Sequence, residues 1–313
     1  MKIVLTGGNG MVGRNIRDHA MAGQHELIAP RSRELDLTDG PATEAYIASV
    51  KPDMIIHAAG RVGGIQANMA HPVEFLVENL DMGRNIVMAA RAAGTRKLIN
   101  IGSSCMYPRA APNPLQESMV LTGELEPTNE GYALAKVMTA RLCDYVRQSN
   151  PGLAYKTLIP CNIFGIHDKF DPAVSHLLPA IIRKVDEAAR TGADSVEIWG
   201  SGEARREFMF ASDLADGIWA AAARFEDLPG MMNMGVGHDH SINDYYAAVA
   251  RVIGWQGSFT HDLSKPVGMQ QKLVSVALQG QFGWLPSTSL DDAIAQTYAH
   301  FRALPAAAQE KHS

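Results

Sequence analysis

Two side chains that could exchange a proton with a substrate stand four residues apart in Tyr132-Ala-Leu-Ala-Lys136. On a helix this spacing places them on one face, with the ammonium of Lys136 beside the phenol of Tyr132. A nearby cation favours the phenolate, and so would lower the pKa of Tyr132 from its ordinary value of about 10. Such a pair also occurs by chance. It gains weight here from Ser103, which follows an apolar run and whose hydroxyl would share a substrate oxygen with the phenol.

Glycines recur directly after the first apolar run, Lys2–Leu5, at Gly7, Gly10 and Gly13. Such a turn lets backbone amides approach a pyrophosphate, and the N-terminus of the helix that follows favours its negative charge. A glycine-rich turn after a strand can also be only a turn. This one opens a strand–helix–strand unit, which favours dinucleotide binding.

The end of the second predicted strand selects between the two nicotinamide dinucleotides. NAD sites usually carry an acidic residue about 20 residues after the glycines, where it binds the ribose 2′-hydroxyl. This chain instead has Arg31 and Arg33, whose guanidinium groups suit a 2′-phosphate. The alternative is that both are solvated loop arginines. We expect NADP(H), with Asp36 as the acceptor at the adenine edge.

The elements that must hold these residues alternate between short apolar runs and longer helical stretches. Strands separated by helices indicate right-handed βαβ units, and hence an α/β fold with a Rossmann-type, doubly wound parallel sheet. The predicted strands are Lys2–Leu5, Glu26–Ala29, Met54–His57, Lys97–Ile101 and Tyr155–Ile159. The predicted helices, with apolar residues at helical spacing, are Met11–Ala22, Pro41–Val50, Pro72–Ala93 and Glu130–Ser149.

After about residue 164 the pattern becomes mixed, which predicts a smaller α/β substrate domain at the C-terminal side. We expect a cofactor domain of residues 1–165 that also includes residues 212–236. The remaining residues, 166–211 and 237–313, are expected to form the substrate domain. The segments expected in the second part are helices His176–Ala189, Ser212–Phe225, Ile242–Ile253 and Leu290–Phe301, strands Ser195–Gly200 and Met231–Gly235, the basic and apolar stretch Arg205–Phe210, and a frayed tail Ala306–Ser313.

The composition excludes several classes of protein. With 46% hydrophobic and 19% charged residues the chain is expected to fold around a core, and a net charge of −5 argues against a nucleic-acid-binding protein. Three cysteines cannot form a disulfide framework and match no zinc spacing, so we expect no metal. We also expect no secretory leader, no membrane span and a location in the cytoplasm.

Several motifs together resemble the extended short-chain dehydrogenase/reductases that act on nucleotide sugars, and within them the GDP-L-fucose synthase family. The resemblance runs from Lys2 to about Phe301. It implies a bifunctional 3,5-epimerase and 4-reductase that converts GDP-4-keto-6-deoxy-D-mannose to GDP-L-fucose with NADPH. The motifs are His57-Ala-Ala-Gly-Arg-Val-Gly-Gly-Ile65, Gly102-Ser-Ser-Cys-Met-Tyr-Pro108, Leu125-Glu-Pro-Thr-Asn-Glu130, Asn162-Ile-Phe-Gly165, His167-Asp-Lys-Phe170, Ser175-His176, Trp199-Gly-Ser-Gly202 and Arg206-Glu-Phe208.

The same resemblance implies roles for individual residues. Cys105 would be the base that removes the C3 and C5 protons, and His176 the acid that returns a proton to the opposite face. Lys136 would hold the cofactor ribose and lower the pKa of Tyr132, which would protonate the C4 oxygen. From the residues alone, the favoured interpretations are that Cys105 is a small buried apolar residue and His176 a histidine at a helix start. The expected cofactor contacts are Gly7, Gly10, Met11, Val12, Gly13, Arg31, Arg33, Asp36, Ala58, Lys136, Cys161, Asn162, Ile163, Phe164 and His176.

The substrate positions implied by the resemblance are Lys184, Trp199, Arg206 and Lys272. Arg206 and Lys184 would neutralise the pyrophosphate of a GDP-sugar, although a solvated Lys184 is equally expected from the sequence alone. The chain departs from the family pattern in four stretches, and in two of them a carboxylate is replaced. These stretches are Lys265-Pro-Val-Gly268, Lys272-Leu-Val-Ser275, Arg206-Glu-Phe-Met-Phe-Ala-Ser-Asp213 and Lys169 in His167-Asp-Lys-Phe170.

These departures leave two alternatives open. One is the same chemistry on another GDP-4-keto sugar, such as a deoxy-heptose or colitose precursor. The other is an NADP-binding regulatory module without turnover, which the intact Ser103, Tyr132 and Lys136 argue against. The resemblance also implies a homodimer that pairs helices Pro72–Ala93 and Glu130–Ser149 of each subunit, although their apolar faces could be covered within one chain.

Overall fold

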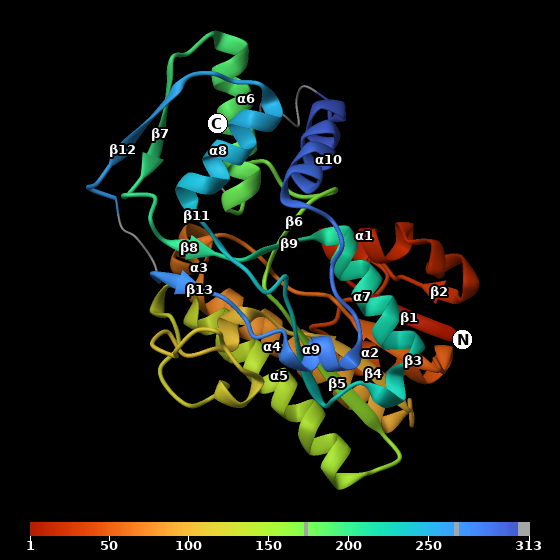
Figure 1. Cartoon of the computed structure of the whole chain (residues 1–313). Coiled ribbons are helices and arrows are strands. Elements are labelled where there is room, and N and C mark those ends of the chain that lie inside the picture. The colour runs from red at the N-terminus through yellow and green to blue at the C-terminus, as the bar shows by residue number, and fades with distance from the viewer. Residues whose placement is uncertain (172–174, 266–268, 306–313) are drawn as a thin grey trace.

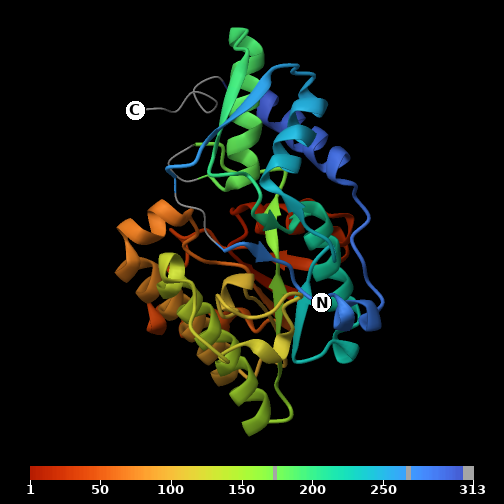
Figure 2. The same cartoon turned by 60° about the vertical axis from the view of Figure 1, so that its left-hand side comes forward.

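The computed structural model describes residues 1–171, 175–265 and 269–305 (Figure 1). Residues 266–268 of one departing stretch and the tail 306–313 therefore lie outside the described residues. A lower part built on a large sheet carries an upper part of helices and short strands, and Figure 2 shows the same arrangement from the side.

The lower part is organised around a six-stranded sheet in the order β10-β5-β4-β3-β1-β2, in which every pair is parallel. This confirms the predicted Rossmann-type fold. The last strand, β10, joins the sheet beside β5, although more than 60 residues separate them in the chain. The strands are β1 Lys2–Thr6, β2 Glu26–Ile28, β3 Met54–His57, β4 Lys97–Ile101, β5 Ala154–Pro160 and β10 Met231–Met234.

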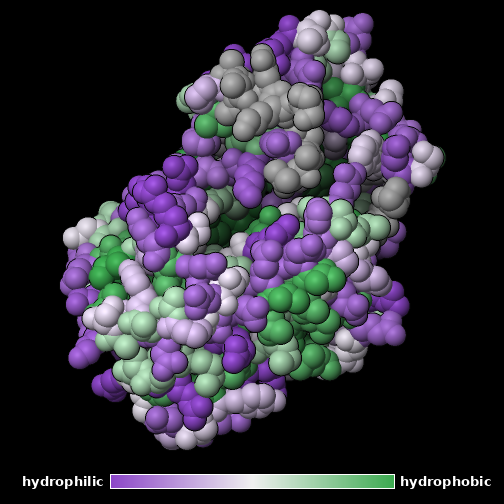
Figure 3. Space-filling view, turned by 180° about the vertical axis from the view of Figure 1, so that it is seen from behind, coloured by the Kyte–Doolittle hydropathy of each residue, from purple (hydrophilic) through white to green (hydrophobic). Residues whose placement is uncertain are grey.

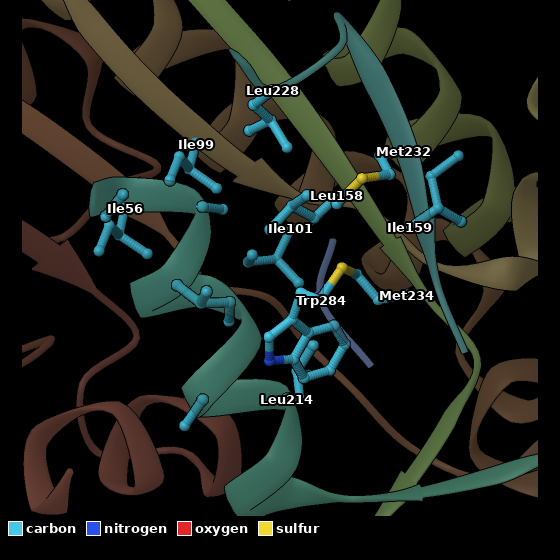
Figure 4. Close-up of a cluster of buried hydrophobic side chains, with 14 of the residues drawn as sticks. Ile56, Ile99, Ile101, Leu158, Ile159, Leu214, Leu228, Met232, Met234 and Trp284 are labelled. Carbon is cyan, nitrogen blue, oxygen red and sulfur yellow. The ribbon is translucent and has the colours of Figure 1, made fainter. Parts of the chain in front are cut away.

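Helices cover both faces of this sheet, as expected for βαβ units. Helices α2, α4 and α5 pack together on one face, over a core that includes Val4, Ile55 and Leu98. Helices α1 and α7 pack on the other face, where Figure 4 shows Ile56, Ile99 and Leu214 among the buried side chains. The helices of this part are α1 Met11–Asp18, α2 Gly40–Val50, α3 Ile65–Ala70, α4 Pro72–Ala92, α5 Glu130–Ser149, α7 Ala211–Ala223 and α9 Ala277–Phe282.

Local chemistry explains where several helices begin and end. Asp39 caps α2 by accepting the backbone N–H of Ala42 at 3.0 Å. Helix α1 stops at Asp18, so the prediction that it continues to Ala22 is wrong. His19 adopts an extended backbone and its ring accepts the N–H of Met21, after which the chain continues as a 3₁₀ helix. The 3₁₀ helices lie at Ala20–Gln24, Ser104–Met106, Glu117–Met119, Pro127–Asn129 and Phe225–Asp227.

The upper part has its own core, with Leu178, Val249 and Phe301 among its buried residues. Its strands form small sheets of two or three, most of them too short to leave a periodic pattern in the sequence. None of the described helices is long and apolar enough to cross a membrane. The elements are α6 Leu177–Thr191, α8 Ile242–Ile253, α10 Leu290–Ala303, β6 Asn162–Phe164, β7 Ser195–Trp199, β8 Arg205–Arg206, β9 Phe208–Phe210, β11 His240–Ser241, β12 Ser258–Asp262 and β13 Gln271–Lys272.

Candidate active site

The glycine turn lies where the order of strands reverses, between the carboxyl ends of β1 and β3. Gly7 has φ +74°, and a Cβ on it would lie 2.6 Å from the backbone of Ala58. A Cβ on Gly13 would lie 2.2 Å from the carbonyl oxygen of Gly7. Gly10 precedes the first residue of α1, Met11, without a side-chain cap, so the free amides of this helix end suit an anion. The close packing and the helix end fit a dinucleotide pyrophosphate.

The predicted 2′-phosphate site lies just beyond β2. Arg31 and Arg33 are both exposed there, after the strand that pairs with β1. Asp36 is also exposed, and its carboxylate accepts hydrogen bonds from the amide and hydroxyl of Thr38. These hydrogen bonds hold the pKa of Asp36 below its ordinary value, so the group stays an acceptor.

The structure brings Ser103, Tyr132 and Lys136 together at the carboxyl end of β4. Ser103 follows β4, and its hydroxyl accepts the N–H of Cys105 at 3.2 Å and is hydrogen-bonded to the phenol of Tyr132. Helix α5 supplies both Tyr132 and Lys136. The Lys136 ammonium donates to the carbonyl of Ile101 at 2.9 Å and lies 5.8 Å from the centre of the Tyr132 ring.

The expected effect of Lys136 on Tyr132 is wrong for this structure. The pKa of Tyr132 is raised, chiefly by burial and secondarily by the nearby Cys105, and the hydrogen bond with Ser103 opposes the shift only in part. Burial lowers the pKa of Lys136 to about 8. The Lys136 ammonium donates to a backbone carbonyl of β4, and burial rather than this cation decides the direction of the shift in the pKa of Tyr132.

Cys105 differs from the other two cysteines. It is half-buried, and its Sγ accepts hydrogen bonds from Asn129 Nδ2 at 3.2 Å and from Lys272 Nζ at 3.6 Å. Cys143 and Cys161 are buried, and burial raises the pKa of both thiols. The structure describes all three cysteines, and only Cys105 is half-buried with a lysine against its sulfur.

His176 lies at the start of α6, in the N-cap position, rather than inside the helix. Burial lowers its pKa, and the neighbouring Lys169 lowers it further, so the imidazole is neutral at pH 7. Among the described contacts none joins His176 directly to Cys105 or Tyr132. The structure places this predicted acid at the start of α6, where the preceding residue, Ser175, approaches Gly64 of the lower part.

The predicted substrate residues fall into two groups. Lys184 donates to the carbonyl of Glu197 at 2.7 Å and lies 5.8 Å from the centre of the Trp199 ring, which is 52% exposed. Arg206 and Lys272 form the second group, as directly paired residues of the parallel strands β8 and β13. Burial lowers the pKa of Lys184 and of Arg206, which indicates that both cations lie partly shielded from solvent.

Glu207 organises the boundary between the two parts and was not predicted. Its side chain is fully buried and accepts the backbone N–H groups of Val236, Gly237 and Val274 at 2.7, 2.9 and 2.9 Å. Burial raises its pKa to about 7. Its backbone carbonyl accepts from Asn162 Nδ2 at 2.8 Å, which ties β6 and the segment 161–164 to this position.

That segment contains the remaining predicted cofactor residues. Cys161, Asn162, Ile163 and Phe164 run from the end of β5 into β6, which pairs in parallel with β9. Cys161 and Phe164 are buried, whereas Asn162 and Ile163 are half-buried at the sheet edge. The segment thus continues the carboxyl edge that carries Ser103.

Asn129 and Lys265 were also missed by the sequence analysis. Asn129 occupies the N-cap position of α5 without a capping hydrogen bond, and its Nδ2 donates to Cys105 Sγ. The sequence feature that could have indicated it is an asparagine directly before the predicted helix Glu130–Ser149, within the motif Leu125-Glu-Pro-Thr-Asn-Glu130. Lys265, the first residue of one departing stretch, lies 5.4 Å from the centre of the Trp199 ring.

A cavity of about 250 Å³ opens beside this group, between the start of α5 and helices α3 and α4. Tyr132 and Asn129 contribute to its wall. Gly60 adjoins Lys136, and a Cβ there would lie 3.0 Å from Asn79 Oδ1. The lining residues are Asn68, Met69, Pro72, Phe75, Pro127, Thr128, Asn129, Glu130, Gly131 and Tyr132.

The sequence that carries these site residues matches the model of a known protein family. The model of the NAD dependent epimerase/dehydratase family matches residues 3–235, which include the glycine turn, Ser103, Tyr132 and Lys136. The chain belongs to this family. The match ends at the residue after β10, so it also spans the strand that returns to the main sheet.

Individual relatives of this epimerase/dehydratase chain are similar over nearly its whole length. A GDP-L-colitose synthase of Yersinia pseudotuberculosis is 50% identical, over 96% of this chain and 98% of the relative. A GDP-L-fucose synthase of Azorhizobium caulinodans is 49% identical, over 96% of each chain. A GDP-mannoheptose C4 reductase from Campylobacter jejuni, solved with NADP bound, superposes with a TM-score of 0.86 at 28% identity, over 96% of this chain and 98% of that chain.

Proposed function

We propose that this protein is an NADPH-dependent 3,5-epimerase and 4-reductase that converts GDP-4-keto-6-deoxy-D-mannose to GDP-L-fucose. The observation that carries the proposal is the cluster at the end of β4, where Ser103 contacts both Tyr132 and the backbone of Cys105. A carbonyl-activating pair and a candidate carbon base thus stand side by side. The similar relatives named as GDP-L-fucose and GDP-L-colitose synthases support the same substrate class.

The cofactor fits residues of the lower part. The tight approach of Gly7 to Ala58 and the uncapped start of α1 suit the pyrophosphate, and Arg31 and Arg33 suit a 2′-phosphate. When bound, NADPH supplies the hydride that reduces C4. The chain's own task is to polarise the C4 ketone: Ser103 and Tyr132 donate hydrogen bonds to its oxygen, and Tyr132 transfers a proton to it.

Epimerisation uses the acidity of protons next to the ketone. Cys105 as thiolate takes the proton from C3 or C5, and the negative charge moves to the C4 oxygen, where Ser103 and Tyr132 hold it. His176 returns a proton to the opposite face, which inverts the carbon. A neutral imidazole at pH 7 must first take a proton from solvent, so we expect this step to slow as the pH rises.

The substrate half of the site is proposed to hold the GDP moiety. Lys184 and Arg206 face the pyrophosphate, and Trp199 packs against the nucleotide; Lys265, which also lies over Trp199, adds a cation to this group. We propose the corresponding division of the chain, with residues 1–165 and 212–236 binding NADP(H) and residues 166–211 and 237–313 binding the GDP-sugar.

A second candidate substrate is favoured by a specific observation. The colitose synthase relative is as similar as the fucose synthase relative, at 50% against 49% identity. Ser275 also replaces a carboxylate of the family pattern that the resemblance brings to the substrate side. A GDP-4-keto sugar of the colitose type is therefore the alternative, with inversion at a single carbon.

The deciding experiment incubates the enzyme with NADPH and each GDP-4-keto sugar in deuterated water, and follows the ring protons by NMR. Deuterium at both C3 and C5 of the product from GDP-4-keto-6-deoxy-D-mannose is expected. Cys105→Ser should lose deuterium uptake while still binding NADPH. No NADPH oxidation with either sugar would overturn the proposal and favour a binding module without turnover.

We propose that the protein forms a homodimer through α4 and α5. Both helices carry exposed apolar side chains, and Figure 3 shows a broad hydrophobic area on the lower part of the molecule seen from behind. Since the proposed base is a thiol, we place the enzyme in the reducing cytoplasm. The exposed residues on the two helices are Val73, Val77, Met88, Leu134, Met138 and Tyr145.

Light scattering after gel filtration tests this interface. Met138→Glu is expected to give a monomer, because a buried unpaired carboxylate at a helix-bundle interface is costly. Leu263→Glu is the matched control, since Leu263 is exposed but lies on the upper part. A wild-type monomer would contradict the proposed dimer.

A further inference from the structure

The surroundings of Cys105 contain a cation that the proposed mechanism has not used. Lys272 approaches from β13, more than 160 residues away in the chain, and its Nζ lies 3.6 Å from Cys105 Sγ. We propose that Lys272 holds Cys105 as a thiolate and so acts as a positioning residue for proton removal, an inference that rests on the proposed function. Asn129 Nδ2, at 3.2 Å, supplies the second donor to the same sulfur.

The backbone at Lys272 is held by contacts with two other segments of the chain. On one side β13 pairs in parallel with β8, with Lys272 opposite Arg206. On the other side, Asn113 Oδ1 accepts the N–H of Leu273 at 2.8 Å. The buried Glu207 then accepts the next N–H along the strand, from Val274, at 2.9 Å. The strand pairing and these two hydrogen bonds together hold β13 and the residues after it in place.

The other groups near Cys105 cannot replace this charge. Tyr132 is a neighbour whose negative form would repel a thiolate, and burial and Cys105 both raise its pKa. Lys136 is also near, but its ammonium already donates to Ile101, and burial lowers its pKa to about 8. Asn129 is neutral. Lys272, half-buried and aimed at the sulfur, is therefore the cation best placed to favour the thiolate.

The proton transfers balance without any further reactant. The thiolate takes H⁺ from C3 or C5, which forms an S–H bond and leaves the electron pair in the enolate. The enolate then receives H⁺ on the other face from a separate acid, and the thiol returns its own proton to solvent. Lys272 keeps its protons throughout. The positive charge of Lys272 favours the Cys105 thiolate before proton removal, and again once the thiol has released its proton to solvent.

The experiment measures alkylation of each cysteine by iodoacetamide at pH 7, with peptide mass spectrometry to separate the three sites. Lys272→Met is expected to slow alkylation of Cys105 about tenfold, because the thiolate fraction falls when the cation is removed. Lys272→Arg keeps the charge and should stay within about threefold of wild type. The buried Cys143 and Cys161 serve as internal controls and should react slowly in every variant. Circular dichroism and NADPH binding check that each variant is folded.

Two results would overturn the inference: wild-type alkylation of Cys105 in folded Lys272→Met, or equally slow alkylation in Lys272→Arg, which would show that shape rather than charge matters. Deuterium uptake at C3 and C5 separates this inference from the proposed function. Slow alkylation in Lys272→Met together with no uptake by wild type upholds the Lys272–Cys105 pair and overturns the function. Normal deuterium uptake in both wild type and Lys272→Met, together with unchanged alkylation of Cys105, overturns only the Lys272–Cys105 pair.

Discussion

The cofactor side and the substrate side of the site are built in different ways. On the cofactor side, Gly7, Gly10 and Gly13 lie within one turn, and Tyr132 and Lys136 lie on one helix. On the substrate side, Arg206 and Lys272 come from distant segments and meet on strands of two residues. Regular elements position the first set, whereas hydrogen bonds between separate segments position the second.

This difference predicts how each side responds to change. A substitution on the cofactor side acts locally, on one contact or one close approach of the backbone. A substitution on the substrate side acts through shared supports, such as the carboxylate of Glu207, which holds N–H groups from two different segments. The four predictions below test that contrast, beginning with the largest effect.

Tyr132→Phe should break the chemistry of the cofactor side without disturbing its structure. We expect the rate of NADPH oxidation with the keto sugar to fall about 10³-fold, because the proton donor to the C4 oxygen is lost. Tyr145→Phe, on the exposed face of the same helix, should keep the wild-type rate. An unchanged rate for Tyr132→Phe in steady-state assays would remove Tyr132 from the reaction.

Glu207→Gln should alter the pH dependence of stability through the substrate side. Burial raises the pKa of Glu207 to about 7 from an ordinary value of 4.5. The unfolded chain therefore releases this proton at lower pH than the folded chain, and the free energy of unfolding falls as the pH rises from 4.5 to 7. The contribution is full below that window and lost above it.

Urea unfolding at pH 5 and pH 8 measures the effect. In Glu207→Gln the fall in unfolding free energy between the two values should be smaller by up to about 3 kcal/mol. Asp168, whose pKa burial also raises to about 7, contributes in both proteins and cancels in the comparison. The exposed Glu187→Gln is the control and should keep the wild-type slope; equal slopes for all three proteins would contradict the assignment.

Gly13→Ala should disturb the cofactor side by sterics alone. The added Cβ would lie 2.2 Å from the carbonyl oxygen of Gly7, so the turn must shift. We expect the Kd for NADPH to rise about 100-fold, in line with an overpacking cost of about 2–3 kcal/mol. A Cβ on Gly23 meets nothing within 4 Å, so Gly23→Ala should bind NADPH as wild type does in fluorescence titrations.

The double variant Arg31→Ala, Arg33→Ala should give the smallest effect and sharpen the choice of cofactor. Both side chains are exposed, so the fold should be unaffected. We expect kcat/KM with NADPH to fall about tenfold, since charge-assisted contacts to a 2′-phosphate are lost, while kcat/KM with NADH stays constant. A parallel loss with both cofactors would place the arginines outside the 2′-phosphate site.

Much of the lower part could be predicted because its signals are local. The strand β4 and the helix α5 have the predicted bounds, since each has an apolar pattern of its own period over five residues or more. Helix α1 ended four residues early because His19 makes a hydrogen bond that no periodicity reports. The strands β8, β9 and β13 are too short for any pattern to indicate them.

The sequence by itself determined the parallel sheet, the glycine turn and the order of the serine, tyrosine and lysine, because each depends on residues close together in the chain. Only the tertiary structure placed Lys272 and Asn129 against Cys105 and buried Glu207 between the two parts. It also reversed the expected shift in the pKa of Tyr132. Spacing shows which groups are neighbours, but burial and hydrogen-bond partners depend on the packing of distant segments, and these decide the charge of each group.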